Sequence, residues 1–209
     1  MQIDKLTVAD NNVINLILAG VGGQGVLVAS DIIVEVALNA GFDVKKSEVH
    51  GMAQRGGSVV SQVRYGDKIY SPLIKKGTAD VVLSFEKLES IRYLEFIKPN
   101  GCVIFNNQQI TPLTVFTSKI EYPPNIEQLC KRKTQNVLAV NALEIAEKLR
   151  NFKVLNTIML GVISNFMEFD SENWLNVIIK KVPAKTVELN KQAFEQGRNL
   201  ILDMEININ

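Results

Sequence analysis

The chain has 209 residues, of which 46% are hydrophobic, and its formal net charge at pH 7 is +1. This hydrophobic share allows a buried core and excludes wholesale disorder, while the balanced charge gives no sign of a nucleic-acid binder. No run of about twenty apolar residues is present, so no membrane span is expected. The first twelve residues are too polar for a secretory signal, so we expect a soluble globular protein of the cytoplasm.

Cysteine usage limits the metal chemistry that this chain can perform. Cys102 and Cys130 are the only cysteines, and the sequence has no CxxC pair and no Cys/His cluster. Such a pair fits neither a disulfide framework nor the ligand spacing of a zinc or iron–sulfur site. We therefore expect no metal site in this chain.

The N-terminal part reads as a strand, a glycine turn, a helix and a second strand. Residues 13–19 (VINLILA) form a short β-branched apolar run that ends at a glycine, as buried strands do. Residues 26–39 carry apolar side chains at helical spacing, and Gly41 follows where a helix stop is expected. Residues 42–49 resemble a second strand. A parallel sheet is the default for such a unit.

The middle of the chain alternates between strands and turns. Residues 50–57 (HGMAQRGG) read as a loop, and the alternating pattern of residues 58–64 predicts a half-buried strand. The sequence Tyr-Gly-Asp-Lys at 65–68 predicts a hairpin turn into a short strand at residues 69–70. Further strands are predicted at residues 81–85 and 102–106, separated by an amphipathic helix over residues 86–97.

Beyond Pro124 the pattern becomes helical, with helices predicted over residues 136–149, 155–167, 172–182 and 186–201. Pro183 separates the last two, and the apolar stripes that include Trp174 and Phe194 are expected to be core rather than a cofactor box. The predicted fold is therefore a single α/β domain with three layers. It has a mostly parallel Rossmann-like sheet and a helical C-terminal third.

Residues 20–25 (GVGGQG) satisfy G-x-G-x-x-G between a strand and a helix, which favours binding of a nucleotide or phosphate. The alternative is a turn that only lets the helix pack tightly on the strand. A dinucleotide enzyme would need an acidic residue about twenty positions later, and Glu48 lies near that place. A Walker loop is excluded because no Gly-Lys-Ser/Thr follows.

Basic residues are concentrated in one part of the chain. Residues 45–76 contain seven basic side chains and two acidic ones, a local excess of +5. This segment is either a solvated edge with scattered lysines or a docking surface for an anionic ligand or an acidic partner.

Three stretches, read together, carry a family resemblance. They are residues 20–26 (GVGGQGV), residues 47–60 (SEVHGMAQRGGSVV), and residues 70–73 (YSPL) with residues 79–85 (ADVVLSF) and Glu86. The combination resembles the gamma-type domain of the 2-oxoacid:ferredoxin oxidoreductases, and the HGMAQRGG form is similar to the indolepyruvate-specific branch. Residues 187–197 (VELNKQAFEQG) also resemble that branch, so residues 1–209 are expected to form one gamma-type domain.

The resemblance implies one subunit of an enzyme that decarboxylates indolepyruvate or another aryl pyruvate to aryl-acetyl-CoA and reduces ferredoxin. It further implies that thiamine diphosphate, Mg²⁺ and 4Fe-4S clusters sit on a large alpha subunit, with two copies of each subunit in the complex. This chain would then hold no cofactor by itself, lie on the coenzyme A side of the reaction, and be inactive alone. Two alternatives stay open: an independent NAD(P)- or nucleotide-binding α/β protein, and a non-catalytic ligand-sensing module.

Candidate site residues come from the two glycine-containing loops. The amides of Gly22, Gly23 and Gly25 are expected to cradle a phosphate, with Gln24 as a side-chain donor, and Gly22→Val is expected to disrupt a positive φ. Arg55 is a planar cation suited to phosphate or to a salt bridge with the partner. His50, the only histidine, is expected to donate a hydrogen bond or relay a proton at a shared active site, unless it only fixes its own loop. The full set of candidate ligand contacts is Gly20, Gly22, Gly23, Gln24, Gly25, Arg55, Gly56, Gly57 and Ser58.

Overall fold

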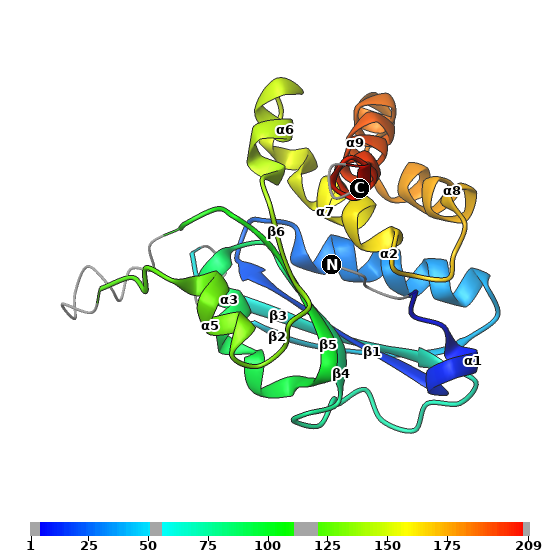
Figure 1. The fold of residues 1–209 in the computed structure, drawn as a ribbon. Helices are drawn as coiled ribbons and strands as arrows, with labels where there is room; N and C mark the ends of the chain where they lie inside the picture. The colour runs from blue at the N-terminus through cyan, green and yellow to red at the C-terminus, as the bar shows by residue number, and fades with distance from the viewer. Residues whose placement is uncertain (1–4, 51–55, 111–120, 207–209) are drawn as a thin grey trace.

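The computed structural model describes residues 5–50, 56–110 and 121–206 and consists of three layers (Figure 1). A six-stranded sheet forms the middle layer. The helices on one face of it are α2 (Val26–Asn39), α6 (Ala142–Lys148), α7 (Leu155–Ser164), α8 (Ser171–Lys181) and α9 (Val187–Ile206). The other face carries α3 (Lys87–Arg92) and α5 (Ile126–Lys131). The predicted three-layer α/β fold with a helical C-terminal third is confirmed.

The strands are β1 (Val13–Val21), β2 (Asp43–His50), β3 (Ser58–Gly66), β4 (Ala79–Ser84), β5 (Ile97–Asn106) and β6 (Val137–Val140). Their order in the sheet is β2-β3-β1-β4-β5-β6, and β1, β4, β5 and β6 are parallel neighbours. β3 is antiparallel to both β1 and β2. The sheet is therefore mostly parallel, as predicted, but β1 and β2 are not adjacent. The short connection between β2 and β3 makes them an antiparallel hairpin, and β3 takes the place beside β1.

The first strand and helix form where the sequence places them. β1 is buried on both faces, with Leu16 and Leu18 in the core under α2 and Ile17 in the core on the opposite face. α2 ends because Gly41 adopts a φ of +90°, which lets the Gly41 amide donate to Leu38 O at 3.0 Å and the Phe42 amide to Ala37 O at 3.2 Å. This is the glycine stop that the sequence predicts.

Three predicted elements differ from the structure. Residues 69–70 form no strand, because the Ile69 amide donates to Asp43 Oδ2 at 2.9 Å rather than to a strand neighbour. The helix predicted over residues 86–97 ends as α3 at Arg92 and is followed by the short 3-10 helix η1 (Leu94–Phe96). The helix predicted over residues 136–149 is instead β6 followed by α6, since Val137 and its neighbours pair with β5. The structure also contains two short helices that the sequence pattern does not predict, α1 (Val8–Asn11) and α5.

The C-terminal helices are structural. Trp174 and Phe194 are fully buried, with ring centroids 6.0 Å apart, so their apolar stripes are core as expected. α7 is buried along its whole length and lies against α9. In the described part of the chain no helix has the length and apolar character needed to cross a bilayer.

Candidate functional site

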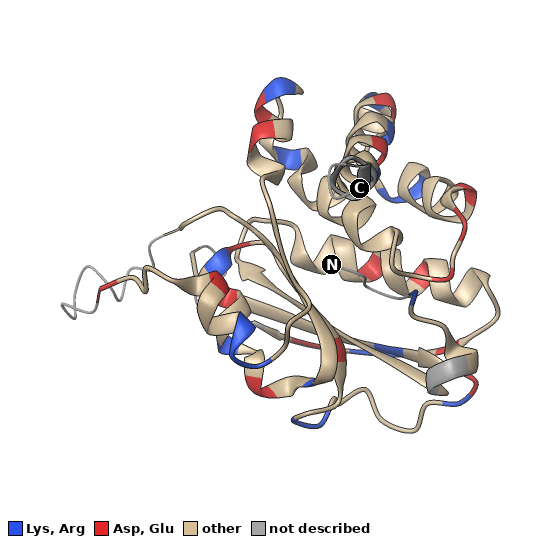
Figure 2. Ribbon diagram, in the orientation of Figure 1, with Lys and Arg blue, Asp and Glu red and all other residues tan. Residues whose placement is uncertain are grey.

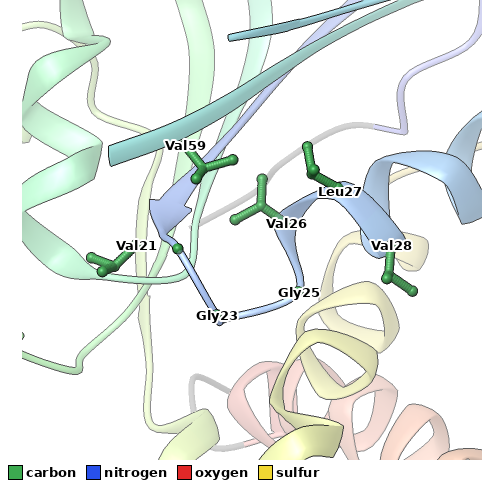
Figure 3. Close-up of a pocket in the computed structure, with 8 residues that line it drawn as sticks. Val21, Gly23, Gly25, Val26, Leu27, Val28 and Val59 are labelled. Carbon is green, nitrogen blue, oxygen red and sulfur yellow. The ribbon is translucent and has the colours of Figure 1, made fainter. Parts of the chain in front are cut away.

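The glycine loop joins the carboxyl end of β1 to the first turn of α2 (Figure 3). Gly23 and Gly25 adopt positive φ angles of 106° and 79°, whereas Gly22 does not. The expectation of strain at Gly22 is therefore wrong, and the left-handed positions are the next glycine and the one at the helix start. Gly20 is required for packing, because a Cβ there would lie 2.7 Å from Val26 Cγ2.

The backbone amides of the loop differ in what they can bind. The Gly22 amide already donates to Gly57 O at 2.8 Å, and the Gln24 amide donates to Val21 O at 3.1 Å. The amides of Gly23 and Gly25 have no acceptor among the described residues. They lie at the N-terminus of a 14-residue helix, where backbone N–H groups and the helix dipole favour an anion. Of the three glycine amides predicted to bind a phosphate, that of Gly22 is already engaged. The amides of Gly23 and Gly25 remain available next to the first turn of α2.

Gln24 holds the loop in place from inside the protein. Its Oε1 accepts from the Val21 amide at 2.8 Å, and its Nε2 donates to Phe85 O at 2.9 Å and to Gln108 Oε1 at 3.1 Å. Both N–H groups of the side-chain amide are therefore engaged. These bonds connect the ends of β1 and β4, the point where the strand order reverses and where open α/β sheets bind ligands.

A cavity of about 390 Å³ lies beside the loop on the β3 side, and its side chains are apolar (Figure 3). Its volume falls within the range of small-molecule sites. Its lining consists of Val21, Gly22, Gly23, Gly25, Val26, Leu27, Val28 and Val59. Free amides next to apolar walls suit a ligand that has both an anionic group and an apolar arm.

A second cavity, of about 410 Å³, lies on the other side of the same loop. It includes Gly23, Gln24 and Gln108 from the carboxyl edge of the sheet. Phe152 of the 3-10 helix η2 (Phe152–Val154) and Leu155 at the start of α7 also line it. The glycine loop is therefore accessible from two directions, and Gly23 borders both cavities.

The second predicted loop meets the first at the start of β3. Gly56 has a φ of +77°, and its amide donates to Gly22 O at 3.4 Å, while Gly57 O accepts from the Gly22 amide. His50 ends β2 with its backbone opposite Val59, which lines the first cavity. The structure thus brings together the glycine loop, Gly56, Gly57 and the backbone of His50. Arg55 lies outside the described residues.

Ser58 faces the other helical layer. Its Oγ donates to Glu89 Oε2 at 2.5 Å, and Glu89 Oε1 lies 3.0 Å from Arg92 Nε. Glu89 is only 2% exposed, and this burial raises the pKa of its carboxyl, although the bonds from Ser58 and Arg92 partly oppose the shift. Sequence reasoning missed Glu89, and the only signal was a carboxylate on the predicted amphipathic helix.

A second buried carboxylate, Glu86, caps α3. Its Oε2 accepts from the amides of Leu88 and Glu89 at 2.8 and 3.1 Å, and its Oε1 accepts from Tyr122 OH at 2.6 Å. Burial and this neighbouring carboxylate raise the pKa of Tyr122. Glu86 thereby fixes the helix that carries Glu89 and stabilises the N-terminus of α3.

The acidic residue of a dinucleotide fingerprint is not beside the glycine loop. Glu48 lies on β2, which is separated from β1 by β3, and its carboxylate pairs with Lys46. In a dinucleotide-binding fold the second strand is adjacent to the first, so that its terminal acid reaches the ribose. The insertion of β3 removes that arrangement.

Metal ligands are not clustered in the described part of the chain, where no three histidine, cysteine or carboxylate side chains converge. Both cysteines are buried, and burial raises the pKa of Cys102 to about 12. A thiol in that state is a packing group rather than a metal ligand.

The chain is similar to known proteins along most of its length. The family model for pyruvate ferredoxin/flavodoxin oxidoreductase matches residues 15–200. The indolepyruvate oxidoreductase subunit IorB of Archaeoglobus fulgidus is 40% identical over 190 residues, which cover 89% of this chain and 94% of that subunit.

Solved structures share the fold. The gamma subunit of a keto/oxoacid ferredoxin oxidoreductase from Geobacter sulfurreducens has a TM-score of 0.68 and 23% identity, covering 88% of this chain and 94% of that one. The 2-oxoglutarate:ferredoxin oxidoreductase of Magnetococcus marinus, solved with coenzyme A bound, has a TM-score of 0.69 and 20% identity. It is matched over 90% of this chain but only 31% of its own. On the family match and the 40% identity, this chain belongs to the pyruvate ferredoxin/flavodoxin oxidoreductase family.

Proposed function

We propose that this chain is the small subunit of a cytoplasmic 2-oxoacid:ferredoxin oxidoreductase that acts on indolepyruvate or another aryl pyruvate. In the overall reaction the carboxylate leaves as CO₂, the aryl-acetyl group passes to the thiol of coenzyme A, and the electrons pass to ferredoxin. The observation that carries the proposal is the 40% identity to an IorB subunit across nearly the whole chain.

The glycine loop is the part of this chain that we assign to coenzyme A. A phosphate group would accept hydrogen bonds from the free amides of Gly23 and Gly25, and the apolar cavity beside them would receive the pantetheine arm. Arg55 precedes Gly57 by two positions in the sequence, and Gly57 O accepts from the Gly22 amide of the glycine loop. Arg55 would therefore supply a permanent positive charge to a second phosphate.

The remaining chemistry belongs to the partner. Thiamine diphosphate, Mg²⁺ and the 4Fe-4S clusters would lie on a large alpha subunit, in a complex with two copies of each chain. His50 would reach the shared active site as a hydrogen-bond donor or proton relay, since its backbone lies opposite Val59 at the rim of the cavity. Ferredoxin would contact the complex rather than this chain alone.

Co-expression with the large subunit tests the proposal. The readout is reduction of an electron acceptor that depends on both indolepyruvate and coenzyme A. We expect activity only when both chains are present. A stable complex that is inactive on aryl pyruvates but active on another 2-oxoacid would contradict the substrate while keeping the enzyme class.

The variant Arg55→Ala tests the proposed coenzyme A contact separately from the enzyme class and the 2-oxoacid substrate. Loss of a charge-assisted hydrogen bond should raise the KM for coenzyme A at least about tenfold and leave the KM for indolepyruvate unchanged. Arg132→Ala, an exposed arginine at the end of α5, is the control and should change neither constant. An unchanged KM for coenzyme A would contradict a phosphate contact by Arg55.

A further inference from the structure

One face of the β2–β3 hairpin is covered by no helix among the described elements. In the register of the hairpin, Lys46 lies opposite Val63 and its Nζ pairs with Asp31 of α2, which identifies the face under α2. The opposite face carries Lys45, Ser47 and Val49 on β2. On that side α3 packs against β1, β4 and β5, so among the described elements no helix covers β2. Val49 is consequently 59% exposed.

A loop at residues 67–78 extends this face. Figure 1 shows the chain between β3 and β4 running on the side of the sheet away from α2. Arg64 donates to Ser71 O at 2.7 Å, and Gln62 Oε1 accepts from the Ile74 amide at 2.7 Å. Both side chains belong to the β3 residues opposite Lys45 and Ser47, so the loop lies over β3 next to them. We call the surface formed by Lys45, Ser47, Val49, Tyr70 and Leu73 the hairpin face.

Hydrogen bonds to β3 hold the loop in place, but the loop presents apolar side chains to solvent. Ile69 and Ile74 are buried and fix its two ends, whereas Tyr70 is 90% exposed and Leu73 is 60% exposed between them. The Arg64 side chain that holds the loop is itself oriented by Asn15 Oδ1 at 2.7 Å. A loop already fixed in this way loses little conformational freedom on binding, and exposed tyrosine on a rigid support is typical of protein interfaces.

The surroundings of the hairpin face are basic. Lys68 and Lys75 lie on the loop that extends this face, and Figure 2 shows basic residues at two places along the chain between β3 and β4. Lys68 and Lys75 are exposed and have no carboxylate within ion-pair distance among the described residues. An acidic partner surface would therefore find unpaired cations beside the apolar centre.

We propose, building on the function above, that the hairpin face docks against an apolar patch with an acidic border on the large subunit of the same oxidoreductase. A second copy of this chain is the poorer occupant, because a two-fold contact would bring Lys68 and Lys75 against the same basic surface. A domain of this fold occupies 31% of a longer chain in the Magnetococcus marinus enzyme, where it is joined to further oxidoreductase polypeptide.

The test measures the dissociation constant between the full-length chain and the purified large subunit. Leu73→Asp and Val49→Asp should each raise Kd at least about tenfold, because each places a charge in the apolar centre of the contact. Leu38→Asp is the matched control, since Leu38 is 52% exposed at the end of α2 on the other face, and it should leave Kd unchanged. The double variant Lys68→Glu and Lys75→Glu should raise Kd and weaken its dependence on salt.

Each outcome bears on a different claim. Wild-type Kd for Leu73→Asp and Val49→Asp, with thermal unfolding of the variants unchanged, would overturn the hairpin face as the docking surface. A wild-type chain that is dimeric alone and becomes monomeric as Leu73→Asp would overturn the assigned occupant in favour of a second copy. The binding measurement needs no catalysis, so a complex that binds through this face but does not turn over indolepyruvate refutes only the substrate.

Discussion

Gly25 and Asn156 lie in direct contact at the start of α2, although 131 positions separate them. A Cβ on Gly25 would approach Asn156 Nδ2 to 2.7 Å, and the φ of +79° is itself unfavourable for any other residue. Gly23 has a φ of +106° but nothing within 4 Å of its Cβ position. The two glycines of the loop therefore serve different physical needs, one conformational and one both conformational and steric.

This difference predicts unequal costs of substitution. Gly23→Ala should lower the free energy of unfolding by about 1–2 kcal/mol, the cost of a left-handed conformation. Gly25→Ala should cost about 1–3 kcal/mol more because of the contact with Asn156. When Asn156 is also replaced by alanine, Gly25→Ala should lower the free energy of unfolding by less than it does in the wild type. Urea unfolding of the two single variants and the double variant measures this difference. Equal costs at the two glycines would contradict the contact.

Glu89 gives the fold a specific pH dependence. Burial raises its folded-state pKa, so the native chain binds a proton more tightly than the unfolded chain between the two pKa values. The associated stability is complete below the unfolded pKa and is lost as pH rises through the folded pKa. Glu89→Gln removes this titration, so the stability of the wild type relative to the variant should fall with rising pH across that window.

Urea unfolding at a series of acidic to neutral pH values checks this expectation. Glu144→Gln, at an exposed position of α6, is the control and should give a constant difference from the wild type. Parallel stability curves for the wild type and Glu89→Gln would mean that the carboxyl of Glu89 titrates alike in the folded and unfolded chains.

Among the elements, α7 and α9 pack with their backbones nearly touching. A Cβ on Gly197 would lie 2.0 Å from Ile158 O, and one on Gly161 would lie 2.1 Å from Phe194 O. Both atoms belong to helix backbones, which cannot rotate away as a side chain can. The two glycines therefore set the separation of the helices that close the core around Trp174.

Gly197→Ala should consequently destabilise the protein by about 3 kcal/mol, the upper part of the usual cost of overpacking, even though alanine is the better helix former. Gln196→Ala, the exposed neighbour in the same helix, should change stability by less than about 0.5 kcal/mol. Thermal and urea unfolding of the two variants distinguishes the cases. A neutral Gly197→Ala would show that the helices can separate without loss of core contacts.

Short apolar runs were the hardest elements to predict. Val137–Val140 (VLAV) sits in a segment with helical spacing, and four residues are too few for periodicity to separate a strand from a helix. The free backbone of β5 decides the outcome, since Val103, Ile104 and Phe105 pair with β6. A neighbour in the sheet, rather than local preference, makes this segment a strand.

At the scale of the whole molecule, the position of β3 controls what the glycine loop can bind. Neighbouring strands lie about 4.8 Å apart, so β2 and Glu48 are about 10 Å from β1 in the sheet. We therefore expect no saturable binding of NADH or NADPH by this chain or its complex, measured by nicotinamide fluorescence, while coenzyme A binds in calorimetry. Saturable NADH binding that Gly23→Ala abolishes would restore the alternative of an independent dinucleotide-binding protein.

Elements whose signals are local can be predicted from the amino-acid sequence. The apolar run of β1, the glycine loop, the periodicity of α2, its stop at Gly41 and helices α8 and α9 all follow from residues a few positions apart. The resemblance of residues 20–26 and 47–60 to the gamma-type domain also needed no structure, and the family match confirms it.

The contacts between these elements, by contrast, depend on residues that are far apart in the chain. Gln24 holds the glycine loop in place because its side-chain amide donates to the carbonyl of Phe85, 61 residues away. Ser58 was predicted to contact a ligand, but its hydroxyl donates to Glu89, 31 residues away. The hairpin brings β3 to the side of β1, and among the described elements no helix covers the outer face of β2. Each outcome depends on a partner that is distant in the chain. An unpaired polar group is costly to bury, so the packing decides which partners Gln24 and Ser58 find.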